Sequence, residues 1–381
     1  MLLLTGATGF VGSHLLTHLL ASRPDRRVVL LVRRPDQVVD LTADERVAAL
    51  PGDLTREGLG LERATRARLA RSITEIVHCA AITQFGAPIE TARAVNAGGT
   101  RRVLDLAREC RRLEKLAHVS TVYVAGRASG VIAEAAAPPP AAGFCNSYQH
   151  SKHEAEALVL ESMAHVPCAI YRLSSIVGDS RTGRVVQFNH VHQLMRLFPR
   201  NVLPIMPAEP AAPVDLVATD WAIAALGHLF DASFAAGCIA QVCAGRDASL
   251  TVREVVDLTR RAYERHPLGQ RACPIRVPEF VSLADFERYV ERHRRTTDRL
   301  FGELLRVLGY FLPHLGIEQA FENHVTMKGL ADSELRLPPI REYYERVVHY
   351  GLDTAWGKVA EPGRRQALQA APSTSPEGRS S

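Results

Sequence analysis

Two residues of the chain lie at a spacing that suits proton transfer. Tyr148 precedes Lys152 by four residues, and Lys152 is one of only four lysines in a chain with 42 arginines. Residues four apart share one face of a helix. A free phenol has a pKa of about 10, and a nearby ammonium lowers this pKa because it stabilises the phenolate. The pair is therefore a candidate acid–base centre at neutral pH.

A glycine-rich loop at the start of the chain is typical of a dinucleotide site. The segment TGATGFVG places Gly6, Gly9 and Gly12 three residues apart, after an apolar run and before a helical pattern. Glycines let the backbone turn sharply and approach a pyrophosphate, whose charge the helix N-terminus stabilises. A tight turn between a strand and a helix, without a ligand, is the alternative interpretation.

The segment LVRRPD, which ends the next apolar run, bears on the choice of cofactor. Arginine at this point accommodates the extra phosphate of NADPH, whereas an acidic residue holds the ribose of NADH. Arg33 and Arg34 therefore favour NADPH, and Asp36, which lies further out, makes NADH the less favoured alternative. Two arginines on an exposed turn, with no role in binding, are a third interpretation.

Two later segments also fit a dinucleotide. Asp53, in GDL after the third apolar run, is expected to meet the adenine amino group. Ala80 and Ala81 end the segment HCAA, where a bulky residue would block the cofactor.

A parallel sheet would bring these residues together. Apolar runs predict strands over 1–6, 27–34, 46–55, 75–81, 115–126 and 167–179, and a late strand over 237–245. Helical patterns lie between them, including one from Asn146 to about Met163 and one capped by Ser249 or Thr251. Apolar strands that alternate with helices indicate an α/β fold with a doubly wound (Rossmann) parallel sheet.

The two halves of the chain differ in this alternation. We expect residues 1–180 to form an NAD(P)-binding Rossmann core, with later core elements near 213–260. Residues 181–212 and 261–358 are expected to form a smaller, mostly helical, substrate-binding lobe. The polar residues 359–381 are expected to be disordered, because they contain few apolar side chains.

The composition disfavours several other classes of protein. Hydrophobic residues make up 46%, charged residues 23%, and the net charge of +5 is spread along the chain, so no nucleic-acid partner is expected. No run of eighteen apolar residues predicts a membrane span. The apolar start is interpreted as a strand rather than a signal peptide, and seven cysteines without a CxxC pair suit a reducing, cytoplasmic location. Neither these nor the fifteen histidines show metal-ligand spacing, so no metal is expected, and the oligomeric state stays open.

In order and spacing, these motifs resemble those of the extended short-chain dehydrogenases/reductases. The resemblance covers about the first 180 residues and rests on TGATGFVG, GDL, HCAA, NAGGT at 96–100, STVYVAG at 120–126 and YQHSK at 148–152. It implies an NAD(P)-dependent oxidoreductase.

The resemblance also implies a set of site residues. The catalytic set would be Thr121, Tyr148 and Lys152, with Asn96 supporting the lysine through water or the backbone. Thr121 would hold the substrate oxygen beside the tyrosine hydroxyl, and Lys152 would bond the nicotinamide ribose. The residues that would contact the cofactor are Gly6, Thr8, Gly9, Phe10, Gly12, Arg33, Arg34, Asp53, Leu54, Ala80, Ala81, Tyr148 and Lys152.

Several segments resemble the thioester reductase and fatty acyl-CoA reductase branch of that family. These are YRLSSIVGDSRTG at 171–183, APVDLV at 212–217 and FENHVT at 321–326, although Ser174 stands where that branch often has proline. Val122 and Tyr123 follow Thr121, where dehydratases of the family carry two carboxylates, and this disfavours dehydration.

The branch implies a reaction and a substrate class. NADPH would reduce an acyl thioester, bound to CoA or to a carrier protein, to an aldehyde or alcohol, with Tyr148 as proton donor. Residues 188–207 would line an acyl channel or simply pack the lobe. Residues 291–299 would meet CoA phosphates or an acidic carrier protein, or form a solvated helix face.

Three other functions use the same features. One is a dehydrogenase or ketoreductase of a hydroxyl or ketone in a sterol-like or polyketide-like molecule. Another is a sugar-nucleotide epimerase. The last is a cofactor-binding sensor without catalysis, which the complete set of Thr121, Tyr148 and Lys152 argues against.

Overall fold

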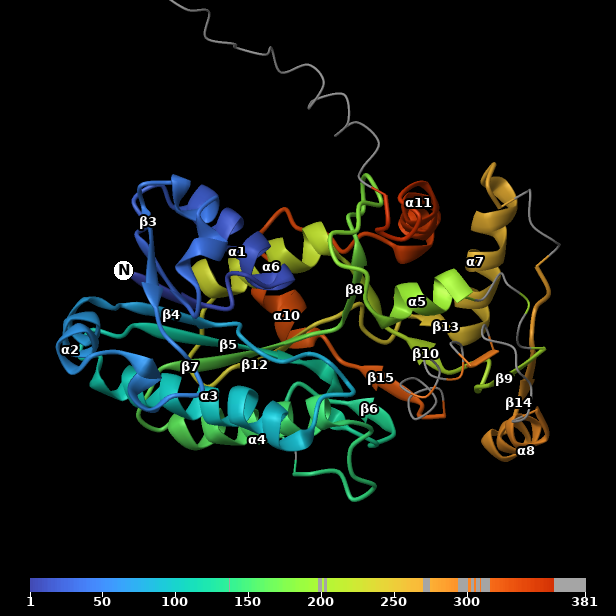
Figure 1. Ribbon diagram of the computed structural model, residues 1–381, viewed down its shortest axis with the longest axis horizontal. Coiled ribbons are helices and arrows are strands. Elements are labelled where there is room, and N and C mark those ends of the chain that lie inside the picture. The colour runs from blue at the N-terminus through green and yellow to red at the C-terminus, as the bar shows by residue number, and fades with distance from the viewer. Residues whose placement is uncertain are drawn as a thin grey trace, which may run out of the picture.

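A parallel sheet of seven strands forms the centre of the protein (Figure 1). The computed structural model describes residues 1–136, 138–197, 201, 204–269, 275–293, 301, 302, 305, 309 and 316–359. Across the sheet the strands are β12 (Ile239–Val242), β7 (Cys168–Leu173), β5 (Lys115–Thr121), β4 (Glu75–His78), β1 (Leu2–Thr5), β2 (Val28–Val32) and β3 (Val47–Pro51). All neighbours pair in parallel. The direction of winding changes between β1 and β4, where doubly wound sheets bind their ligands.

Helices cover both faces of the sheet, which explains why its strands are apolar without interruption. Figure 1 shows α1 (Phe10–Ser22) and α6 (Thr219–Asp231) on one face, and α3 (Ile89–Glu109) and α4 (Ser147–Ser162) on the other. The buried residues of α2 (Arg63–Ser72) join the same cluster as those of α3. Successive side chains of a strand point to opposite faces of the sheet, so alternate residues pack under different helices. Leu2 and Leu4 join the core cluster under α1 and α6, whereas Leu3 joins the cluster under α3. The predicted doubly wound α/β fold is confirmed.

The second half of the chain, together with β6 of the first half, extends the fold beyond the carboxyl ends of the strands. Short pairs form there: β8 (Ser175–Gly178) with β11 (Leu216–Ala218), β9 (Ile205–Pro207) with β14 (Glu279–Val281), β10 (Pro213–Val214) with β13 (Leu250–Thr251), and β6 (Gly130–Ile132) with β15 (Gln319–Phe321). The helices are α5 (His190–Leu197), α7 (Val252–Arg265), α8 (Leu283–His293), α10 (His324–Gly329) and α11 (Ile340–Asp353). The boundaries between core and lobe stay a prediction.

Some predicted elements have different ends in the structure. The strand predicted over 115–126 ends at Thr121, and 3-10 helix η4 (Val122–Ala125) follows. The strand predicted over 167–179 is two strands, because β7 stays in the central sheet while β8 pairs with β11. Asn146 caps α4, and Thr251 caps α7 through a capping box with Glu254.

Parts of three predicted segments lie outside the described residues. They are 198–200 and 202–203 of the acyl-channel segment, 294–299 of the basic segment, and the tail from residue 360. Among the helices that the structure describes, none combines the length and apolarity that a membrane crossing requires.

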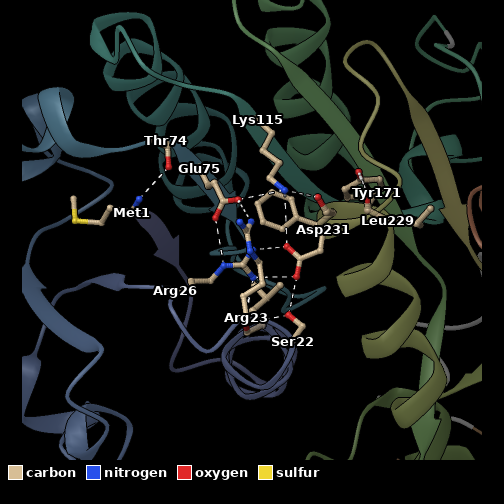
Figure 2. A network of polar contacts seen from close by, with 12 residues as sticks. Met1, Ser22, Arg23, Arg26, Thr74, Glu75, Lys115, Tyr171, Leu229 and Asp231 are labelled. Atoms are coloured by element: carbon tan, nitrogen blue, oxygen red, sulfur yellow. Dashed lines mark hydrogen bonds and ion pairs between the residues drawn. The ribbon is translucent and has the colours of Figure 1, made fainter. Parts of the chain in front are cut away.

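A buried network of charges ties the amino ends of β4 and β5 to α6 (Figure 2). Lys115 Nζ donates to the Phe230 carbonyl at 2.9 Å and lies 3.3 Å from a Glu75 oxygen. Arg26, whose side chain is 2% exposed, pairs with Asp231 at 2.5 Å and with Glu75 at 3.4 Å. Each charge is therefore compensated by an opposite one, as buried charges require.

Asp231→Asn is expected to destabilise the protein by about 3 kcal/mol, because it leaves buried cations with one carboxylate fewer. Urea unfolding would measure the change in the free energy of unfolding. Asp105→Asn is the matched control, because its partner Arg108 and Asp105 are both about half exposed, at 46% and 48%. Its cost should stay below about 1 kcal/mol. Equal costs for the two variants would show that the network adds nothing beyond a surface pair.

Candidate active site

A cavity of about 1260 Å³ lies at the carboxyl ends of the central strands. It contains the glycine loop after β1, the end of β2, the loops after β3 and β4, and the end of β5. The structure thus brings together residues that lie up to 146 positions apart in the chain, from Gly6 to Lys152. The predicted site residues that line it are Gly6, Thr8, Gly9, Phe10, Gly12, Arg33, Arg34, Asp53, Leu54, Ala80, Ala81, Thr121, Tyr148 and Lys152.

Two glycines of the loop, Gly6 and Gly12, have no room for a side chain. Gly6 has φ +81°, and a Cβ there would stand 2.6 Å from the backbone nitrogen of Ala80. A Cβ on Gly12 would stand 2.1 Å from the carbonyl oxygen of Gly6. Helix α1 begins at Phe10, immediately after Gly9, so its free amide groups face the loop. This cradle fits a dinucleotide pyrophosphate.

Charged groups surround the cavity at the end of β2. Arg33 and Arg34 are exposed and line it, whereas Asp36 lies in 3-10 helix η1 (Pro35–Val38) and outside the lining. The Asp53 carboxylate accepts hydrogen bonds from the backbone and the hydroxyl of Thr55, at 2.8 and 2.7 Å. These two bonds lower the pKa of Asp53, and the charge of Arg33 lowers it further against the effect of burial.

Thr121 and Tyr148 both line the cavity and contact each other there. Thr121 is the last residue of β5, and its hydroxyl is hydrogen-bonded to Tyr148 at the start of α4. The Tyr148 ring stacks on Phe85 with 5.9 Å between centroids. Burial raises the pKa of Tyr148 above its ordinary value, and the Thr121 hydrogen bond lowers it only in part. Tyr148 is therefore protonated at neutral pH and can donate a proton.

The sequence predicts that Lys152 and the charge of an oxidised nicotinamide together lower the pKa of Tyr148. In the structure burial is the largest influence on this pKa, and it raises it. The Lys152 ammonium makes its direct contacts with other groups. It donates to the Val119 carbonyl at 2.9 Å and lies 3.1 Å from His118 Nε2. Burial lowers the pKa of Lys152 to about 8, and the charge of Glu156 raises it in part.

Asn96, which was expected to support the lysine through water or the backbone, makes its direct contacts with Ile82 and Ser151. Its side-chain amide donates to the Ile82 carbonyl at 3.0 Å and to the Ser151 hydroxyl at 2.9 Å. Its side-chain oxygen accepts from the Ile82 nitrogen at 2.8 Å. Asn96 thus fixes the loop after β4 against α4, while His118, which the sequence reasoning missed, contacts Lys152.

The same cavity is also lined by apolar side chains from the second half of the chain. Phe188, Leu194 and Met195, from the segment that includes α5, line it together with residues of α7. Two hydroxyl groups of the lining contact each other, with Tyr123 Oη 2.7 Å from Ser175 Oγ. Ser174, which departs from the pattern of the thioester branch, donates its hydroxyl to the Asp215 carbonyl at 3.0 Å. Among the described residues, no group of three metal-ligating side chains is placed to hold an ion.

Several known proteins are similar in sequence to a large part of this chain. Residues 4–226 match the family described as Male sterility protein. Isonitrile lipopeptide synthase of Streptomyces coeruleorubidus is 37% identical over 238 residues, which are 57% of this chain and 16% of that protein. Fatty acyl-CoA reductase 1 of Gallus gallus is 29% identical over 268 residues, 57% of this chain and 52% of that protein. The chain therefore spans about half or less of the curated relatives it matches.

A solved structure has the same fold over nearly the whole chain. The terminal R domain from the myxalamid PKS-NRPS biosynthetic pathway superposes with a TM-score of 0.78 and 24% sequence identity. The superposition covers 94% of this chain and 92% of that one.

Proposed function

Because the chain belongs to the Male sterility protein family, the thioester and fatty acyl-CoA reductase branch of the extended short-chain dehydrogenases/reductases, we propose that it reduces an acyl thioester with NADPH. One observation carries the proposal: a single cavity is lined by the glycine loop, by Thr121, Tyr148 and Lys152, and by apolar side chains of α5 and α7. A dinucleotide fits against the glycine loop, and an acyl chain fits against the apolar side chains.

The residues present account for the steps of such a reduction. A bound NADPH supplies the hydride, which adds to the thioester carbonyl carbon. Thr121 and Tyr148 donate hydrogen bonds to the carbonyl oxygen as it gains negative charge, and Tyr148 supplies its proton. The resulting hemithioacetal returns that proton as its C–S bond breaks. One thioester, one NADPH and one proton then give one aldehyde, one thiol and one NADP⁺. A second NADPH and a second proton would reduce the aldehyde to the alcohol.

Arg33 and Arg34 support NADPH over NADH as the reductant. Loss of charge-assisted hydrogen bonds to a phosphate costs about one to two powers of ten in affinity. Replacing both arginines by alanine is therefore expected to raise the KM for NADPH about 10- to 100-fold, with little effect on the KM for NADH. Steady-state kinetics with both cofactors would show this, and Arg71→Ala, at the exposed end of α2, is the control. An unchanged ratio of the two KM values would contradict the assignment.

A stoichiometric assay tests the reaction. The protein would be incubated with NADPH and acyl-CoAs of increasing chain length, and free thiol, aldehyde or alcohol, and NADPH would be measured together. We expect one thiol released for each acyl group reduced, with NADPH consumed in step. Oxidation of a secondary alcohol without any thiol release would instead favour a dehydrogenase of hydroxyl or ketone substrates.

A further inference from the structure

We propose that His118 is the positioning residue of Lys152, holding the ammonium through a hydrogen bond accepted at Nε2. His118 lies in β5, three residues before Thr121, and it is 0% exposed. The proposal deepens the proposed function, since it concerns the same lysine, and it gives that lysine a direct contact that sequence motifs did not indicate. It rests on which nitrogen of His118, and of its neighbour His78, carries the ring hydrogen.

The neighbouring His78 has a defined tautomer. Thr100 Oγ1 donates its single hydrogen to the Asn96 carbonyl at 2.6 Å, so it can only accept from His78 Nε2, which lies 3.0 Å away. Thr5 Oγ1 accepts from the Ala80 nitrogen and lies 2.7 Å from His78 Nδ1, to which its own hydrogen is free to point. His78 is therefore a neutral ring with both nitrogens paired. Burial, with the charge of Lys152, lowers its pKa to about 3.

His118 carries its hydrogen on the other nitrogen. An ammonium has three N–H groups and no lone pair, so at 3.1 Å from Lys152 Nζ the Nε2 of His118 must accept. A neutral ring that accepts at Nε2 carries its hydrogen on Nδ1. In the described part of the chain, that Nδ1 has no hydrogen-bond partner. Burial, and then the charge of Lys152, keeps the pKa of His118 far below its usual range, which agrees with a neutral ring.

Packing alone does not explain a histidine at this position. A buried N–H without a partner is unfavourable, and an apolar ring of similar size would avoid it. The His78 and His118 rings already pack together, with 5.4 Å between centroids, and an apolar side chain could do the same. What an apolar residue could not supply is a lone pair for the ammonium.

The two acceptors together fix the direction of the ammonium. His118 Nε2 and the Val119 carbonyl take two of its three hydrogens, and Lys152 also lines the cavity, so the third is left for a ligand there. Other groups that face Lys152 are Cys79, after β4, and Glu156, one turn further along α4. Glu156 is itself paired with Arg172 of β7 at 2.8 Å, so His118 and Val119 supply the direct contacts.

Substitutions that move the acceptor test the proposal. Glutamine places its amide at the distance of Nε2 from the backbone, whereas asparagine places it at the distance of Nδ1. His118→Gln should therefore keep the hydrogen bond to Lys152, and His118→Asn should lose it. If His118→Asn does not fold, His118→Met fills similar space without an equivalent acceptor. His165→Asn, at an exposed position after α4, is the control.

The readout is the titration of Lys152 in the protein alone. Because the chain has only four lysines, lysine labelled with ¹³C at Cε gives four NMR signals, and Lys152→Met identifies one of them. We expect the wild-type Lys152 signal to titrate near pH 8. Loss of an acceptor disfavours the charged form, so His118→Asn should move the midpoint down by about one pH unit or more. His118→Gln and the control should stay within a few tenths of the wild type.

Two results would overturn the proposal. One is a Lys152 midpoint that is the same in His118→Asn, or in His118→Met, as in the wild type. The other is a midpoint in His118→Gln that shifts as far as in His118→Asn, because then the ring shape and not the acceptor matters. Since the titration needs neither cofactor nor substrate, it can support His118 even if no thiol is released in the assay of the proposed function.

Discussion

Tyr148→Phe is expected to lower kcat by about 10³-fold while NADPH affinity stays within about threefold. The substitution removes only the hydroxyl, which general acid catalysis requires and whose loss typically costs 10²- to 10⁴-fold. The ring that stacks on Phe85 remains, so the cavity should keep its shape. Steady-state turnover and the fluorescence of bound NADPH would measure the two effects separately.

The control for this variant removes a buried tyrosine hydroxyl elsewhere. Tyr171 donates to the Leu229 carbonyl at 3.0 Å, in the core between the sheet and α6 and outside the cavity lining. Tyr171→Phe should lower the unfolding temperature but leave turnover near the wild-type value. Turnover in Tyr148→Phe above a tenth of the wild-type rate would show that another group donates the proton.

Gly12→Ala is expected to weaken NADPH binding by about 10- to 100-fold. Its Cβ would stand 2.1 Å from the Gly6 carbonyl oxygen, so the loop must move away from α1. Overpacking of this kind costs about 1–3 kcal/mol, and the cost falls on the loop that forms the cradle. The dissociation constant, from fluorescence titration, is the direct measurement.

Gly316→Ala serves as the control for the glycine loop, because an added Cβ there meets nothing within 4 Å. It should bind NADPH as the wild type does. Thermal melting of both variants separates a local change in the loop from general unfolding. Binding in Gly12→Ala within threefold of the wild type would mean that the cofactor does not use this loop.

The central sheet was predictable because its signals are local. Each strand from β1 to β5, and β7 and β12, is an apolar run with helical or turn residues on either side. The small pairs beyond the sheet carry no such signal. β6 and β15, for example, join residues 130–132 to 319–321, and strands of three residues leave no period to detect. Their pairing depends on tertiary contacts.

The site residues that belong to sequence motifs were predictable, whereas contacts that depend on side-chain packing were missed. Tyr148, Lys152 and the glycine loop follow from spacing, and the structure brings them to one cavity. Contacts of Asn96 and His118 depend on which side chains meet between β4, β5 and α4. A histidine inside the apolar run LAHVST was the available signal, but a core histidine with ordinary partners gives the same pattern. The direction of the Tyr148 pKa likewise depends on burial, which a sequence does not show.

The most direct test of thioester reduction follows the hydride. NADPH that carries deuterium at the transferable position of nicotinamide C4 would be incubated with the protein and an acyl-CoA, and the product's mass measured. Reduction predicts one deuterium on the former carbonyl carbon of the aldehyde, with one CoA thiol released for each. Deuterium that stays on the nicotinamide, or CoA release that yields only the free acid, would contradict it.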